Sequence, residues 1–186
     1  MKDERAGRKT KARPKPPAKP KGAHARSDNV RARADVTTSF ELALVVAHNA
    51  FLQWVARCGA AARGGSFSPL DLIVLALTNS LLREKRAADI CFALKVEDAH
   101  TVSYSLKKLA AAGLVTSQRK GKEALFVTTQ AGRDFCVRYQ EIRRTFLIEA
   151  LEVLSGDELN VMEIAAHLRA LSGMYEQAAR SVTTAA

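Results

Sequence analysis

Residues 97–115, EDAHTVSYSLKKLAAAGLV, place polar side chains at helical spacing where they could contact nucleic acid. On a helix, His100, Tyr104 and Lys107 share one face, and the opposite arc is apolar. The apolar residues are Ala99, Val102, Leu106 and Leu109. No acid follows Asp98 on the polar face, whereas a solvated helix usually mixes Glu with Lys. The segment is therefore either a basic surface helix without a ligand or a helix that contacts a duplex.

Each polar group of this segment has a chemical role that it could perform on DNA. Hydroxyl, imidazole and phenol groups reach base edges or phosphates, ammonium groups pair with phosphates, and a first-turn backbone N–H can hold a phosphate oxygen. A basic turn at residues 119–122, RKGK, follows the helix and adds further cations. The predicted DNA-binding residues are Asp98, His100, Thr101, Ser103, Tyr104, Lys107, Lys108, Arg119, Lys120 and Lys122.

The residues around this helix predict further helices and one β-hairpin that would position it. Ser68 followed by Pro69 predicts a helix start, and residues 155–158, SGDE, match a capping box. Residues 83–86, REKR, read as a polar linker, and 114–129 as a hairpin. Helices are expected over 37–63, 68–82, 87–96, 97–112, 130–154 and 155 to about 180.

Two short helices followed by a hairpin are typical of a winged helix-turn-helix domain. The outer helices are apolar on more than one side, so a partner subunit is their expected cover. We therefore expect a mainly α fold with a small β-hairpin wing. Residues 68–132 would form a winged helix-turn-helix DNA-binding lobe, and 36–62 with 133–180 would form a helical dimerisation layer in a homodimer.

Residues 1–35 differ in composition from the rest of the chain. They hold twelve bases and four acids, so they carry +8 of the net charge of +10, and they contain four of the five prolines. With Val30 as their one large aliphatic residue, they bury too little apolar surface to offset the entropy of ordering, which predicts disorder. This Lys/Pro/Ala tail is either a non-specific DNA arm, with a reach of about 30–35 Å, or only a solubilising segment.

Other function classes lack a sequence signature. No apolar run is long enough for a signal peptide or a membrane helix, so we expect a cytoplasmic, nucleoid-associated protein without a membrane partner. The four histidines have no metal-ligand spacing. The chain also lacks a nucleophile elbow, a P-loop and a paired-carboxylate motif. We therefore expect no metal, no cofactor and no enzyme activity.

Two short motifs carry a family resemblance. Residues 87–115 run from a short helix through the polar helix to GLV, and VTTQAG ends the hairpin with Thr129 and Gly132 in register with an L-T-x-x-G motif. In this order they resemble the MarR family of winged-helix transcription regulators, and the likeness extends over about residues 36–180. The wing departs from the family pattern, because Lys120 and Lys122 stand where the family usually has the Asp and Arg of a D-x-R element.

The resemblance implies how such a protein would act. A two-fold dimer would place two recognition helices in successive major grooves, about 10 bp apart. The family commonly binds a small aromatic acid or phenol between the dimer layer and the lobe, but no motif in this sequence marks that pocket. Some members sense oxidants through a thiol, and Cys136 beside Arg133 and Arg138 is then the candidate for a lowered pKa. Cys58 and Cys91 fit small buried hydrophobic positions.

The sequence therefore predicts a sequence-specific DNA-binding transcription regulator that acts as a homodimer and responds to an effector. An architectural, linker-histone-like protein that compacts DNA without an operator is the alternative, since a winged helix with a Lys/Pro/Ala tail fits it too. The long C-terminal helices argue against that alternative, because a linker histone needs no dimer layer. A protein–protein adaptor built on the same fold is a more distant alternative.

Overall fold

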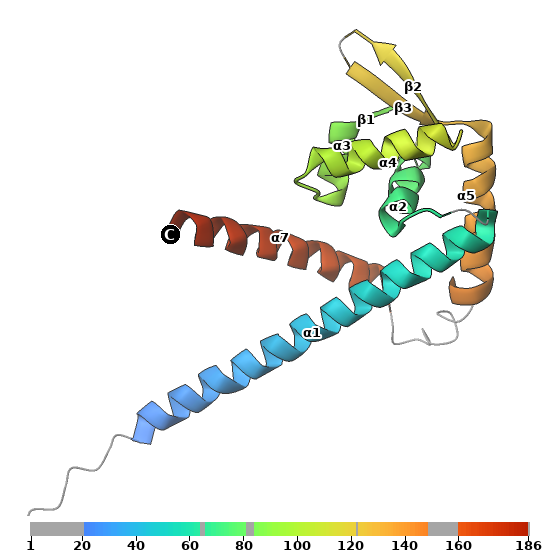
Figure 1. The fold of residues 1–186 in the computed structure, drawn as a ribbon. Coiled ribbons are helices and arrows are strands. Elements are labelled where there is room, and N and C mark those ends of the chain that lie inside the picture. The colour runs from blue at the N-terminus through green and yellow to red at the C-terminus, as the bar shows by residue number, and fades with distance from the viewer. Residues whose placement is uncertain (1–20, 64–65, 81–83, 122, 149–159, 186) are drawn as a thin grey trace, which may run out of the picture. The chain divides into compact units, whose positions relative to one another are not determined.

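The computed structural model describes residues 21–63, 66–80, 84–121, 123–148 and 160–185 of the 186-residue chain. The chain divides into two compact units, Met1–Asn49 and Ala50–Ala186. Helix α1 (Lys21–Arg63) runs across their boundary. The second unit continues with α2 (Pro69–Asn79), β1 (Lys85–Arg86), α3 (Ala87–Leu94), α4 (Ala99–Ala111), β2 (Val115–Lys120), β3 (Glu123–Thr128), α5 (Gln130–Arg143), the π-helix η1 (Arg144–Ile148) and α7 (Val161–Ala185) (Figure 1).

The described part of the first unit is helical from Lys21 onward. Residues 21–35, which fall in the tail predicted to be disordered, belong to this helix, while 1–20 lie outside the described residues. The prolines of the tail end at Pro20, and the residues that follow are rich in Ala and Arg, which are strong helix formers. This local preference favours a helix from Lys21 onward even where little apolar surface is buried.

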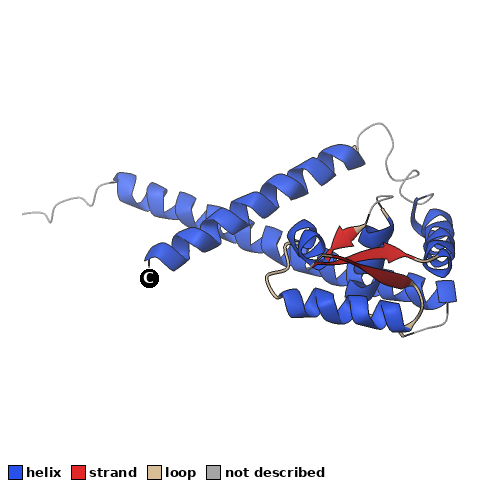
Figure 2. Ribbon diagram, turned by 90° about the horizontal axis from the view of Figure 1, so that it is seen from above, coloured by secondary structure: helices blue, strands red, loops and turns tan. Residues whose placement is uncertain are grey.

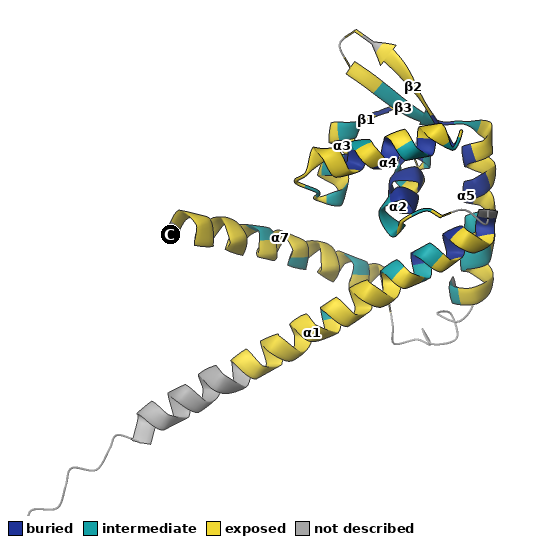
Figure 3. Cartoon of the chain, in the orientation of Figure 1, coloured by how far each residue is buried: buried dark blue, intermediate teal, exposed yellow. Residues whose placement is uncertain are grey.

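Within the second unit, the core of the lobe lies where α2, α4 and α5 meet the sheet (Figure 3). Helix α4 buries Val102, Leu106 and Leu109 completely, as its apolar spacing predicts. Each such side chain contributes about 1.5–3 kcal/mol of hydrophobic stabilisation. Ala99 is exposed, contrary to the prediction, because it is the first residue of α4 and the packed part of the helix begins one turn later.

The sheet has three antiparallel strands in the order β1-β3-β2 (Figure 2). Strands β2 and β3 form the predicted hairpin, hereafter the wing, and Gly121 has a φ of 65° at its turn. The prediction of residues 83–86 as a linker is wrong for Lys85 and Arg86, which pair with Phe126 and Leu125. Backbone hydrogen bonds hold this short strand, and its two charged residues give no apolar alternation that could predict it.

Helix ends follow the predicted caps where the structure describes them. Ser68 caps α2, as predicted, and Asp71 completes a reciprocal capping box that was not predicted. The helix ends at Asn79 rather than at 82. Helix α5 passes into η1, and the remainder of the predicted helix to 154 lies outside the described residues. The predicted capping box at 155–158 also lies outside them. Helix α7 begins at Val161, where Asn160 Oδ1 accepts a hydrogen bond of 3.0 Å from the backbone N–H of Met162.

Helix α7 carries an exposed apolar stripe, hereafter the α7 stripe. Its members recur at steps of three, four and seven, so they fall on one side of the helix. They are Val161, Ile164, Leu168, Tyr175 and Val182. Among the described residues, no helix is both long enough and apolar enough to cross a membrane.

Candidate nucleic-acid interface

The N-terminus of α4 is fixed by Asp98. Its carboxylate accepts hydrogen bonds from the backbone N–H of His100 at 2.9 Å and from the Thr101 hydroxyl at 3.0 Å. These bonds, the one from His100 first, hold the pKa of Asp98 below its ordinary value. Asp98 therefore caps the helix and orients Thr101, and its predicted contact with DNA stays a prediction. A carboxylate at this position also suits the helix dipole.

One side of α4 faces solvent and forms the surface that we call the reading face. It consists of His100, Thr101, Tyr104 and Lys107, all exposed. Tyr104 is 70% exposed although it is a large aromatic residue. Predicted site residue Ser103 is half-buried beside this face. The predicted polar side of the helix thus has the solvent access that contact with a duplex requires.

Lys108 does not belong to this exposed group. Its Nζ lies 2.8 Å from Asp71 Oδ2, and Asp71 is only 2% exposed. Burial by itself would raise the pKa of Asp71, but hydrogen bonds from Lys108, Ser68 and Ser105 outweigh burial and hold that pKa below its ordinary value. Lys108 also lies over the Phe67 ring, at 5.6 Å from the centroid. Asp71 holds the ammonium in this structure, and the predicted contact of Lys108 with a phosphate stays a prediction.

A shallow depression of about 340 Å³ lies beside the reading face. Ser103 and Lys107 of α4 line it, together with Ala87 and Ala88 in the first turn of α3 and Phe126 of β3. Glu123 of β3 lines it as well, and Asp89 already caps the first turn of α3, so the depression carries charges of both signs.

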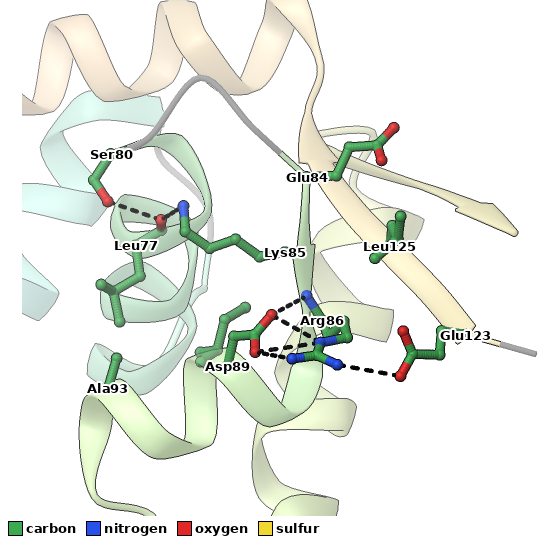
Figure 4. A pocket seen from close by; sticks show the side chains of 10 residues that line it. Leu77, Ser80, Glu84, Lys85, Arg86, Asp89, Ala93, Glu123 and Leu125 are labelled. Carbon is green, nitrogen blue, oxygen red and sulfur yellow. Dashed lines mark hydrogen bonds and ion pairs between the residues drawn. The ribbon is translucent and has the colours of Figure 1, made fainter. Parts of the chain in front are cut away.

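Arg86 also lines this depression, and the sequence analysis missed it because it lay in the predicted linker. Its guanidinium donates to Asp89 at 2.8 Å and pairs with Glu123 of β3 at 3.3 Å (Figure 4). Arg86 therefore ties the start of α3 to the wing. The backbone bond from Arg86 N to Asp89 Oδ2, 3.1 Å long, could have been anticipated from the i, i+3 spacing of an N-terminal acid.

Arg86, Asp89 and Glu123 also border a second cavity, of about 570 Å³ (Figure 4). Lys85 Nζ donates to the carbonyl of Leu77 at the end of α2, and Ser80 Oγ donates to the same carbonyl at 2.9 Å. The positive charge of Arg86 is already paired with two carboxylates. The cationic groups that line this cavity, Lys85 and Arg86, already have partners, so they are poorly placed to bind an anionic ligand.

The wing supplies one described basic residue. Arg119 is exposed on β2 and lies opposite Ala124 in the hairpin register. The side chain of Lys120 is not among those described, and Lys122 lies outside the described residues. The predicted contacts of these two lysines therefore stay predictions.

The L-T-x-x-G motif joins α4, the wing and α5 at one point. Thr129 Oγ1 donates to the carbonyl of Gly113 at 2.7 Å and accepts from the backbone N–H of Gly132 at 3.0 Å. The backbone N–H of Thr129 donates to the carbonyl of Leu114, also at 3.0 Å. Gly113 has a φ of 71°, which favours glycine. The motif thus fixes where the wing leaves the recognition helix.

A separate apolar cavity of about 300 Å³ lies between the C-terminal part of α1, α2 and α5. Its lining is mostly aliphatic and aromatic, with polar groups at Tyr139 and Arg143. Tyr139 has a raised pKa, chiefly because of burial. The full lining is Phe51, Val55, Leu72, Ile73, Ala76, Leu77, Ser80, Tyr139 and Arg143.

Cys136 lacks the surroundings that were predicted to make its thiol reactive. Burial raises the pKa of the Cys136 thiol to about 11, so the prediction of a lowered pKa is wrong. The two neighbouring arginines do not pair with the thiol, because each is hydrogen-bonded to a backbone carbonyl. Arg133 donates to the carbonyl of Thr128 at 2.8 Å and Arg138 to that of Ala62 at 3.0 Å. Cys58 is buried as predicted, whereas Cys91, predicted to be buried as well, is only half-buried at the surface of α3. In the part of the chain that the structure describes, no three His, Cys, Asp or Glu side chains are grouped to hold a metal ion.

Residues 67–132 match the family model described as a winged helix DNA-binding domain. The lobe built from α2 to β3 is therefore similar to winged helix DNA-binding domains. No curated protein sequence matches the chain significantly.

The solved structures extend the likeness beyond the lobe. A MarR family regulator from Neisseria meningitidis has a TM-score of 0.62 at 19% identity, over 77% of this chain and 96% of its own. The transcriptional regulator BldR from Sulfolobus solfataricus has a TM-score of 0.59 at 17% identity, over 76% and 97%. Streptococcus pneumoniae FabT in complex with DNA has a TM-score of 0.55 at 16% identity, over 77% and 98%. The predicted resemblance to the MarR family is thereby confirmed, and at these identities the likeness establishes the fold.

Proposed function

We propose that this protein is a sequence-specific DNA-binding transcription regulator that works by binding rather than by catalysis. The observation that carries the proposal is the reading face, which presents four polar side chains to solvent on the helix that follows α3 in a winged helix DNA-binding domain. Residues 68–132 would form the DNA-binding lobe. Such a regulator acts where the DNA is, so we propose the cytoplasm, at the nucleoid, as its compartment.

We propose further that the protein acts as a homodimer through residues 36–62 and 133–180. Support comes from the α7 stripe and from the exposed apolar side chains of α1 between Val36 and Phe51. A contiguous set of exposed apolar side chains is typical of a protein–protein interaction site. A two-fold axis would place two reading faces in successive major grooves about 10 bp apart.

The DNA test uses the full-length chain and a duplex that it enriches from a random-sequence library. Tyr104→Ala is expected to weaken binding to this operator by about tenfold or more, since one good base contact provides about 1–3 kcal/mol of discrimination. Affinity for a scrambled duplex should stay within about twofold. The matched control Lys107→Met should weaken both duplexes alike and lower the slope of log K against log salt by about one.

The outcomes of this test separate the candidate functions. Failure to enrich any sequence, with equal affinity for all duplexes, would favour the architectural, linker-histone-like alternative. Failure to bind any duplex at low salt would favour an adaptor. If the Tyr104→Ala protein binds the operator as tightly as the wild type does, the reading face does not recognise the operator sequence.

We propose a small aromatic acid as the effector class, bound in the 300 Å³ cavity between α1, α2 and α5. A volume of this order holds a one-ring molecule and stands at the lower end of natural ligand sites, about 300–1,000 Å³. The apolar lining suits the ring, the Arg143 guanidinium suits a carboxylate, and the Tyr139 hydroxyl suits a phenolic oxygen.

Calorimetric titration with benzoate and 2-hydroxybenzoate tests the effector class. We expect Arg143→Met to weaken binding about tenfold or more, because a hydrogen bond to a charged group contributes about 1.5–3 kcal/mol. Arg144→Met is the matched control, since Arg144 does not line the cavity and its loss should leave binding unchanged. Full affinity of the Arg143 variant, or no binding by the wild type, would exclude this ligand class at this site.

A further inference from the structure

The contact of α4 with the rest of the lobe is mostly apolar. Val102, Leu106 and Leu109 are fully buried along its inner side. Apolar burial is favourable but non-directional, so it resists separation of two helices more than a small rotation or shift of one along the other. A helix that must present its outer face to a duplex with a fixed rotation needs a directional contact as well.

Such a contact is present at Asp71, in the first turn of α2. Its Oδ2 accepts from Lys108 Nζ at 2.8 Å and from the backbone N–H of Ser68 at 2.8 Å. The buried Ser105 side chain, one turn before Lys108 on α4, also helps to lower the pKa of this carboxylate. The buried Asp71 carboxylate thus interacts with Lys108 and Ser105, which lie three residues apart on α4. The N-cap of α2 holds the carboxylate in place.

The surroundings favour this geometry over other positions of Lys108. The ammonium lies 5.6 Å from the centroid of the Phe67 ring, and Phe67 packs edge-on against Phe135 at a centroid distance of 6.2 Å. Phe135 is 2% exposed and belongs to the core. The Phe67 ring is therefore held in place by the core, and the Lys108 side chain lies over this ring where it reaches Asp71.

We propose that Asp71 is a positioning residue for DNA recognition: through Lys108 and Ser105 it sets the rotation and axial position of α4, and with them the aim of the reading face. The inference rests on the proposed DNA-binding function. It differs from a purely stabilising role, since its loss should reduce operator discrimination in protein that is still folded. It also assigns Lys108 an internal role, in contrast to the exposed Lys107 next to it.

The test compares Asp71→Asn and Lys108→Met with Lys107→Met in the full-length chain. For each variant, affinities for the enriched operator and a scrambled duplex are measured over a range of salt concentrations. Urea unfolding of each variant gives the folded fraction. We expect Asp71→Asn and Lys108→Met each to weaken operator binding about tenfold, with scrambled binding within about twofold. The double variant should be no worse than either single one, because the two residues act through one contact.

Salt dependence separates positioning from direct contact. Lys108→Met should keep the wild-type slope of log K against log salt, whereas Lys107→Met should lose about one unit. Lys108→Arg, which can still pair with Asp71, should restore most of the discrimination. A lower slope with equal weakening on both duplexes would show that Lys108 contacts phosphate, and this would overturn the proposal.

The remaining outcomes are also decisive. An unchanged ratio of operator to scrambled affinity in folded Asp71→Asn and Lys108→Met protein would overturn the positioning role and leave the DNA-binding function intact. If the wild-type chain enriches no operator, the proposed function fails, and the positioning role fails with it. Because Lys108 is partly exposed, Lys108→Met gives a readout even if Asp71→Asn does not fold.

Discussion

Gly132→Ala is expected to lower the free energy of unfolding by about 3 kcal/mol, the upper part of the range for overpacking a tight site. A Cβ at residue 132 would lie 2.0 Å from the carbonyl oxygen of Leu114 and 3.2 Å from Thr128 Cγ2. The first of these atoms is backbone, so it cannot move aside without shifting the junction of α4 with the wing. Urea unfolding followed by circular dichroism measures the change.

Gly173→Ala is the matched control for this substitution. Residue 173 lies inside α7, and a Cβ there meets no atom within 4 Å. Alanine should therefore raise helix stability by about 0.5–1 kcal/mol, because glycine is the more flexible residue in the unfolded chain. Equal effects of the two substitutions, or a stable Gly132→Ala protein, would contradict the close approach at the L-T-x-x-G motif.

Leu168→Glu is expected to raise the dissociation constant of the proposed homodimer by about 100-fold or more. Leu168 lies in the middle of the α7 stripe and is 47% exposed. A carboxylate buried in an apolar interface without a partner costs several kcal/mol, and each 1.4 kcal/mol is a factor of ten. Operator affinity should fall as well, since both half-sites must be occupied together. Sedimentation equilibrium and gel-shift titration provide the two measurements.

Ala170→Glu controls for the added negative charge. Residue 170 is exposed and is rotated about 200° from residue 168 on the same helix. This variant should keep the wild-type dissociation constant. A Leu168→Glu protein with unchanged mass at micromolar concentration would show that the α7 stripe is not the dimer contact.

The parts of the fold that the sequence predicted well are those with a local chemical cause. Ser68 with Pro69 predicted the start of α2, and the positive φ of Gly113 agrees with its predicted place at the end of α4. The apolar spacing of α4 correctly separated Val102 and Leu106 from the exposed polar side. These features depend on residues within one or two turns of one another, so the sequence alone carries the information.

The parts that the sequence did not predict depend on distant contacts. Strand β1 exists because β3, almost forty residues later in the chain, offers a free edge to Lys85 and Arg86. Asp71 had no predicted role, and nothing local pointed to its partner Lys108, which lies in another helix. The lowered pKa expected for Cys136 failed for the same reason, because Arg138 turns to the end of α1.

The strand order β1-β3-β2 has a consequence for the behaviour of the protein at high concentration. It leaves β2 as an edge strand, and an edge strand can pair with the edge of another molecule and start aggregation. The sequence of β2 ends in Arg119 and Lys120, and repulsion between such charges opposes pairing with a second copy. The cations proposed to approach DNA thus also protect the wing from self-association, so the sequence of β2 is constrained by solubility as well as by binding.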